Sequence, residues 1–132
     1  MTTQGAISRI EHAFDTSLPA DYKDYLTNRA RPGLGDSYEF PLPTGTSFGR
    51  LGIVDGMHTA EEILENDANN ASWDDVAKML IVGWDLSGGF VYLSLAQERP
   101  GIFYRCPHVS SEYVCVASTF TSFLAMLRER PD

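Results

Sequence analysis

The chain has 132 residues, of which 43% are hydrophobic and 21% charged, the balance of an ordinary folded protein and not of a disordered or repetitive one. This length suits one domain with its own core, so we expect a single domain over residues 1–132. The formal net charge of −8 disfavours binding to nucleic acid or to an anionic membrane and favours a basic protein partner. No apolar run approaches the roughly 20 residues that cross a bilayer, and no export signal is visible, so we expect a cytoplasmic protein.

Two amphipathic helices are predicted at the start of the chain. The first begins after Thr2 or Thr3, either of which can cap a helix, and the second has Pro19 at its first position. Apolar residues at helical spacing form one face of each helix: Ile7, Ile10 and Phe14 in the first, and Tyr22, Tyr25 and Leu26 in the second.

The middle of the chain predicts little regular structure. Residues 31–50 hold three prolines and four glycines, which permits at most a short edge strand over residues 38–40. Thr59 then caps a short third helix, whose acidic first turn suits the positive end of the helix dipole. We expect this helix to end in the polar run 66–70.

The second half predicts a β-meander. Residues 79–84 and 90–95 are β-prone and are joined by residues 85–89, a connection with turn chemistry, so they form the clearest hairpin. Two further strands are predicted over residues 102–106 and 113–117. The predicted sheet is therefore antiparallel.

A last helix closes the predicted fold. Ser118 is its expected cap, and Arg128 and Arg130 are expected at its C-terminal end, where the helix dipole favours positive charge. Its apolar stripe comprises Phe120, Phe123, Leu124 and Leu127. The order of elements predicts an α+β fold in which one antiparallel sheet is flanked by N-terminal helices and a C-terminal helix.

Four motifs in sequence order resemble the SMI1/KNR4 (SUKH) family. They are Leu18-Pro19-x-Asp21-Tyr22-x-x-Tyr25-Leu26, Leu80-Ile81-Val82-Gly83, Phe90-Val91-Tyr92-Leu93 and Ala117-Ser118-x-Phe120-x-x-Phe123-Leu124. The resemblance implies an SMI1/KNR4-like fold and a function in protein binding. Many bacterial members neutralise a co-encoded toxin, often a nuclease, while fungal relatives regulate cell-wall synthesis and signalling. It therefore implies an immunity protein or, as the alternative, a regulatory or scaffold domain.

The negative charge is concentrated in one segment. Residues 55–85 hold eight acidic residues against Lys78 alone, whereas the segments before and after are close to neutral. We expect this segment to bind a basic partner, with Trp73 as an aromatic anchor and Trp84 in the core. The candidate partner-binding residues are Asp55, Glu61, Glu62, Glu65, Asp67, Trp73, Asp74, Asp75 and Asp85.

No catalytic or cofactor site is predicted. The motif Gly45-Thr46-Ser47-Phe48-Gly49 has the spacing of a nucleophile elbow, but it lacks the strand and helix that such an elbow requires. Cys106, His108 and Cys115 supply fewer than the four ligands of a structural zinc site, and we expect both cysteines to be free thiols. A small hydrolase that uses Ser47, or Cys106 with His108, is the least favoured alternative.

Overall fold

The computed structural model describes residues 2–28, 37–43, 49–68 and 78–129, and it confirms the α+β class. The helices are α1 (Thr3–Ala13), α2 (Ala20–Asn28), α3 (Ala60–Ala68) and α4 (Phe120–Met126). The strands are β1 (Tyr38–Pro41), β2 (Leu51–Val54), β3 (Gly56–Met57), β4 (Met79–Trp84), β5 (Phe90–Ser94), β6 (Ile102–Arg105), β7 (Val114–Ala117) and β8 (Arg128–Glu129).

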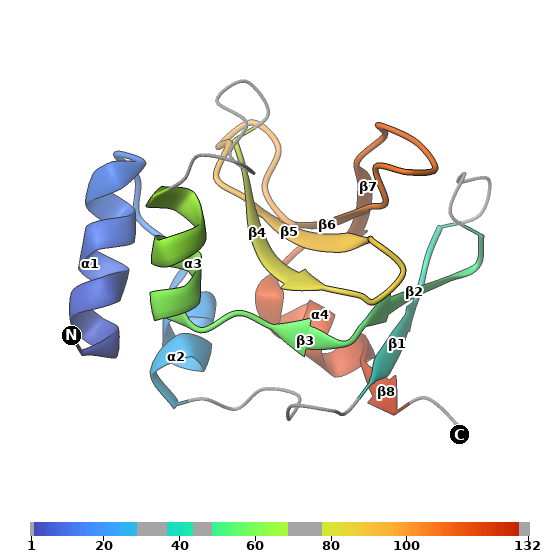
Figure 1. Ribbon diagram of the computed structural model, residues 1–132, viewed down its shortest axis with the longest axis horizontal. Coiled ribbons are helices and arrows are strands. Elements are labelled where there is room, and N and C mark those ends of the chain that lie inside the picture. The colour runs from blue at the N-terminus through green and yellow to red at the C-terminus, as the bar shows by residue number, and fades with distance from the viewer. Residues whose placement is uncertain (1, 29–36, 44–48, 69–77, 130–132) are drawn as a thin grey trace.

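The described strands form two antiparallel sheets, not the single one that the sequence predicted. The larger sheet has the order β3-β4-β5-β6-β7 and contains the predicted hairpin, in which Met79 lies opposite Ser94 and Trp84 opposite Phe90. The smaller sheet has the order β2-β1-β8 (Figure 1). In the same view α4 lies beneath the larger sheet, while α1 and α3 stand side by side at one end of the molecule.

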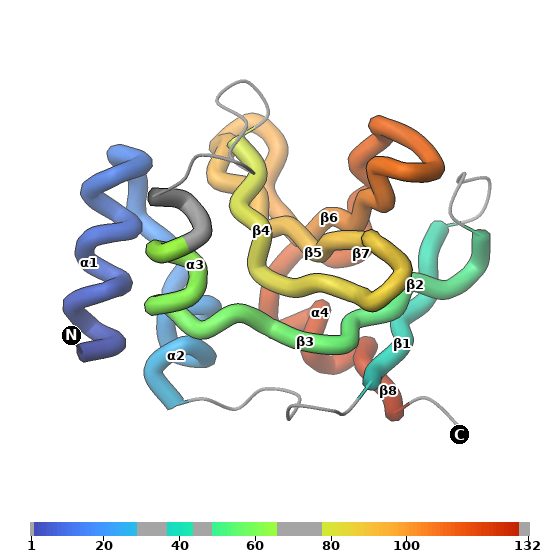
Figure 2. Tube along the Cα trace, in the orientation of Figure 1, coloured from blue at the N-terminus to red at the C-terminus, as the bar shows by residue number. Residues whose placement is uncertain are grey.

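The smaller sheet shows that two predictions were wrong: the edge position of the strand over residues 38–40 and the helical position of Arg128. The strand predicted at an edge, β1, is the middle strand, because β8 pairs with it on the side away from β2. Arg128 was expected to end the last helix, but it lies in β8 and donates from Nε to Glu39 Oε1 over 2.8 Å. Figure 2 shows β8, near the C-terminal end of the chain, beside β1, while the N-terminus lies at the opposite end of the molecule. Arg130 lies outside the described residues.

Helix α4 begins one residue later than predicted. Thr119, not Ser118, is its cap, and the Thr119 side chain accepts a hydrogen bond from Ser122 N over 3.0 Å. Asp21 of α2 supplies a second acceptor. Its Oδ2 accepts hydrogen bonds from the backbone N–H of Thr121 (2.9 Å) and from the Thr121 hydroxyl (3.0 Å). One carboxylate thus ties two helices together that are far apart in sequence.

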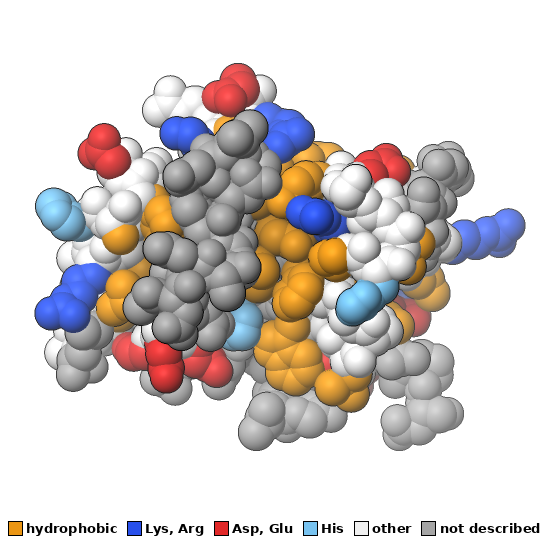
Figure 3. All heavy atoms as spheres, turned by 45° about the horizontal axis from the view of Figure 1, so that its top comes forward, with side chains coloured by type: hydrophobic (Ala, Val, Ile, Leu, Met, Phe, Trp, Pro, Cys, Tyr) orange, Lys and Arg blue, Asp and Glu red, His pale blue; other side chains and the backbone are white. Residues whose placement is uncertain are grey.

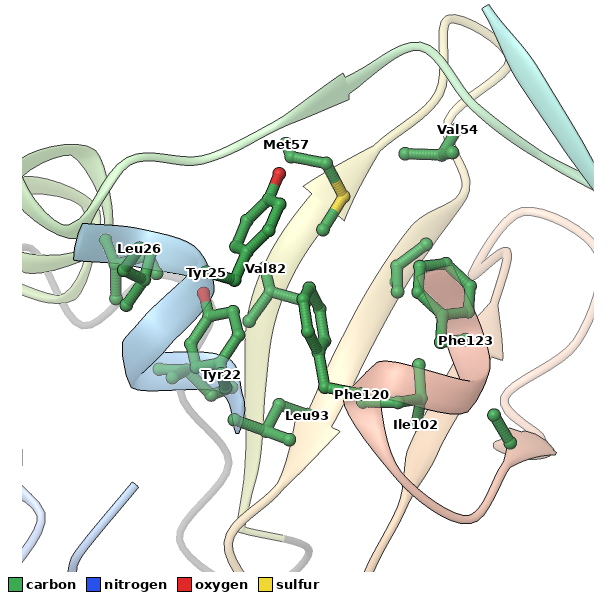
Figure 4. Close-up of a cluster of buried hydrophobic side chains, with 14 of the residues drawn as sticks. Tyr22, Tyr25, Leu26, Val54, Met57, Val82, Leu93, Ile102, Phe120 and Phe123 are labelled. Carbon is green, nitrogen blue, oxygen red and sulfur yellow. The ribbon is translucent and has the colours of Figure 1, made fainter. Parts of the chain in front are cut away.

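Aromatic rings fill the space between α2, α4 and the larger sheet (Figure 4). The ring of Phe120 lies 4.7 Å from that of Tyr22 and 4.8 Å from that of Tyr25, measured between centroids. Phe123 meets Phe40 of β1 in an edge-to-face contact at 5.2 Å. These contacts confirm the predicted apolar faces of α2 and α4 except at Leu127, which follows the helix as its C-cap, and they join the two sheets to one core.

The two cysteines differ in accessibility. Cys106 is buried, Cys115 is exposed, and both are free thiols in the structure. We therefore expect thiol labelling of rapidly quenched cell extract to modify Cys115 quickly and Cys106 only as the protein unfolds, since burial limits access to the reagent. If neither cysteine reacts with the label until a reductant is added, the two cysteines form a disulfide, which would contradict this prediction.

Candidate partner-binding surface

The described part of the acidic segment is centred on α3. Thr59 and Glu62 form a reciprocal cap, in which Glu62 Oε1 accepts from Thr59 N (2.8 Å) and Thr59 Oγ1 accepts from Glu62 N (3.1 Å). Glu61 is half-buried and accepts a hydrogen bond from Thr3 of α1 over 3.2 Å. Glu62 and Glu65 are both exposed residues. The sequence pattern thus correctly predicted that α3 carries carboxylates at the surface.

Four other candidates cannot be placed on this surface. The side chain of Asp67 and all of Trp73, Asp74 and Asp75 lie outside the described residues.

Trp84, predicted in the core, is half-buried and lies outside the main core cluster. Its indole covers Gly56 on the neighbouring strand, where an added Cβ would come within 2.5 Å of the ring.

Asp55 and Asp85 lie in the interior and not on the acidic surface. Their exposed fractions are only 8% and 6%. Asp55 follows β2, where its Oδ2 accepts from Leu86 N over 2.7 Å and its Oδ1 accepts from the Ser37 hydroxyl. Both carboxylates converge on the turn between β4 and β5, so they hold that hairpin in place.

Asp85 organises the turn through four hydrogen bonds. Its Oδ1 accepts from Ser87 N (2.8 Å), Ser87 Oγ (2.5 Å) and Gly89 N (3.0 Å), and its Oδ2 accepts from the Tyr104 hydroxyl (2.7 Å). Burial alone would raise the pKa of Asp85, but these hydrogen bonds to the charged form outweigh it and lower the pKa below its ordinary value. The pKa of Tyr104 is raised, first by burial and then by its bond to Asp85.

The sequence contains a signal for this arrangement. The spacing of Asp85, Ser87 and Gly89 allows the Asp85 carboxylate to accept hydrogen bonds from the backbone N–H groups of Ser87 and Gly89. Gly89 is required because a Cβ there would overlap the Tyr104 hydroxyl and Asp85 Oδ2. The partner Tyr104 comes from β6, and no local pattern predicts that contact.

The residues considered for nucleophilic or metal chemistry are placed only in part. Ser47 lies outside the described residues, and Cys106 is buried. His108 lies against Gly88 of the β4–β5 turn, where an added Cβ would be 2.6 Å from His108 Cδ2. Within the described ranges, no three His, Cys, Asp or Glu side chains are grouped as metal ligands.

An apolar pocket of about 410 Å³ lies where α2 and α4 begin, next to the turn after β5. Its lining includes Pro19, Leu93, Ile102 and Phe120. Asp21 reaches its wall, but one carboxylate oxygen is already bound by Thr121 and the other accepts from Tyr22 N. The pocket therefore suits an apolar group, since most of its lining is apolar and both oxygens of Asp21 already accept hydrogen bonds from the protein.

Comparison with protein families matches residues 1–126 to the SMI1 / KNR4 family (SUKH-1). The chain belongs to this family. Comparisons with curated proteins and with solved structures gave no match. For this SMI1/KNR4 domain, none of the described helices is long and apolar enough to cross a membrane.

Proposed function

We propose that this SMI1/KNR4 domain acts by binding another protein, as an immunity protein that neutralises a cognate toxin. The observation that carries the proposal is the concentration of acidic residues over residues 55–85, in a chain of this family. A nuclease toxin holds nucleic acid on a positively charged surface, and an acidic inhibitor surface complements it. Binding there blocks the substrate without any catalysis by the inhibitor.

The positions of the carboxylates narrow the surface involved. Because Asp55 and Asp85 are buried and internally bonded, the charge that reaches a partner comes from the other six acids. Among the described side chains, Glu62 and Glu65 are exposed on α3. Figure 3 shows acidic side chains grouped on the side of the molecule where the N-terminal helices lie. A field of this kind mainly accelerates encounter, while a buried aromatic anchor slows dissociation.

The same surface would serve a regulatory or scaffold domain with a basic partner. The two functions differ in the neighbouring gene: an immunity protein is encoded next to a secreted or contact-delivered toxin with a basic C-terminal domain. The binding experiment below therefore uses the product of the neighbouring gene.

Reversing three acids, Glu65→Lys with Asp74→Lys and Asp75→Lys, is expected to slow association with that protein at low salt. Added salt should reduce the difference, because charges more than about 10 Å apart are screened at 0.1 M. Surface plasmon resonance at two ionic strengths measures both effects. Glu62 is left unchanged because it caps α3.

The matched control reverses three exposed acids outside the segment, Glu98, Glu112 and Glu129. It makes the same change in net charge and should alter association much less. In the same experiment Trp73→Ala should raise the dissociation rate roughly 30-fold, equivalent to about 2 kcal/mol, if Trp73 is an anchor. Equal association rates for folded wild type and triple variant would rule the proposal out.

A further inference from the structure

The larger sheet has a second apolar face, opposite the one covered by α4. A cluster separate from the main core lies on it, which we call the outer face: Met79, Ile81, Phe90, Tyr92, Phe103 and Tyr113. The strand register explains the cluster, because Ile81 lies opposite Tyr92 and Tyr92 opposite Phe103 across three neighbouring strands. Figure 1 shows the described helices below this sheet or at its end.

The outer face is partly open to solvent. Ile81, Phe90 and Tyr113 are partly buried and keep some exposure, while Met79, Tyr92 and Phe103 are buried. Figure 3, in which the top of the molecule comes forward, shows hydrophobic side chains as a stripe with Lys or Arg side chains beside it. The rings are held in edge-to-face contacts, Tyr92 with Tyr113 at 5.0 Å and Phe90 with Tyr92 at 6.2 Å. A rigid aromatic surface of this kind is typical of protein interfaces.

Two arginines lie over these rings. The guanidinium of Arg99 is 5.4 Å from the centroid of Phe103 and 5.9 Å from that of Tyr113. The guanidinium of Arg105 is 4.7 Å from the centroid of Tyr113, and its Nη1 donates to the Tyr113 hydroxyl over 2.7 Å. The salt bridges between described residues are Lys23 with Glu11 and Arg128 with Glu39, so both positive charges here lack a described carboxylate partner.

One atom of this group is unsatisfied within the described part of the chain. Arg105 Nε is buried and has no hydrogen-bond acceptor among the described residues. Such donors are rare because burial removes the water that would otherwise accept from them. A carboxylate is the acceptor that suits a guanidinium best, since two parallel charge-assisted hydrogen bonds form between them.

We propose that the outer face is a second binding surface, for a segment of a partner protein in which a large apolar side chain stands next to a carboxylate. The apolar side chain packs on Ile81, Phe90 and Tyr113, and the carboxylate accepts hydrogen bonds from Arg105 with Arg99 close by. This surface goes beyond the proposed function, because it selects acidic groups whereas the acidic segment selects basic ones. The domain can thereby recognise two oppositely charged parts of a partner.

The test uses the ¹⁵N-labelled full chain and three capped peptides of one length, Gly-Phe-Glu-Phe-Glu-Gly and its versions with Gln or Lys in place of Glu. In an NMR titration we expect the Glu peptide to shift amide signals of β4 to β7 and to bind about tenfold more tightly than the Gln peptide. The Lys peptide should bind more weakly still. The net charge of −8 acts against this order, so general attraction cannot produce it.

Variants assign the preference to the arginines. Arg105→Gln and Arg99→Gln should each reduce the preference for Glu over Gln, while Arg9→Gln, an exposed arginine on α1, should leave it unchanged. Circular dichroism melting checks that each variant is folded. The proposal is overturned by no binding of the Glu peptide at millimolar concentration, by equal binding of the Glu and Lys peptides, or by an unchanged preference in folded Arg105→Gln. Shifts confined to other elements would overturn it too.

Discussion

Replacing Asp85 with alanine is expected to lower the free energy of unfolding by about 3 kcal/mol, because it leaves several donors of the β4–β5 turn without an acceptor. Gly89 N and the Tyr104 hydroxyl are buried donors, so water does not replace the lost carboxylate. Urea unfolding followed by tryptophan fluorescence measures the loss. Ser87→Ala serves as a milder comparison, since it removes one of the four hydrogen bonds and leaves Asp85 in place.

The effect of Asp85 depends on pH, and its sign follows from the lowered pKa. A carboxyl whose pKa is lower in the folded state stabilises the fold above its unfolded pKa of about 3.9. That contribution is lost as the pH falls through the folded value. The difference in stability between wild type and Asp85→Asn should therefore be largest near neutral pH and shrink below about pH 4. A difference that stays constant from pH 7 to pH 3 would contradict this role for Asp85.

Tyr104 gives an independent check of the same contact. Tyr104→Phe keeps the ring and removes only the hydroxyl that donates to Asp85. If the two groups act together, the combined variant Tyr104→Phe with Asp85→Asn should lose less stability than the two single losses added. Additive losses would show that the two side chains act separately.

Replacing Phe123 with alanine is expected to cost about 3 to 5 kcal/mol of stability, the range for removing a large ring from a packed core. Phe123 is fully buried, and its ring meets Phe40 of the smaller sheet and Phe120 of the same helix. Alanine is the best helix former, so the loss would report the cavity and not a weakened α4. Chemical denaturation provides the measurement.

The next residue in the helix supplies the control. Leu124 is only partly buried, so Leu124→Ala should cost clearly less than Phe123→Ala. Since Phe123 joins α4 to β1, its loss should also loosen the smaller sheet, which hydrogen exchange at β1 amides would detect. A loss below about 1 kcal/mol for Phe123→Ala would contradict its place in the core.

The sequence by itself determined the local elements of this protein. Thr2 and Thr59 cap their helices as predicted, because a cap needs only a side chain within three residues of the N–H that it accepts. The β4–β5 hairpin followed in the same way from two β-prone runs and a short turn. The family could also be recognised, since its motifs are made of these same capping and packing residues.

Only the tertiary structure decided which residues from distant segments meet. Nothing near Arg128 predicts a strand, because β8 exists by pairing with β1, far earlier in the chain. The burial of Asp55 and Asp85 depends on donors that Leu86 and Tyr104 supply from other parts of the fold. The sequence around Arg105 likewise indicates only an ordinary polar residue. Its place on the outer face follows from its position on β6 and its contacts with Tyr113. A local pattern fixes periodicity and caps, whereas burial and charge environment depend on contacts between distant segments.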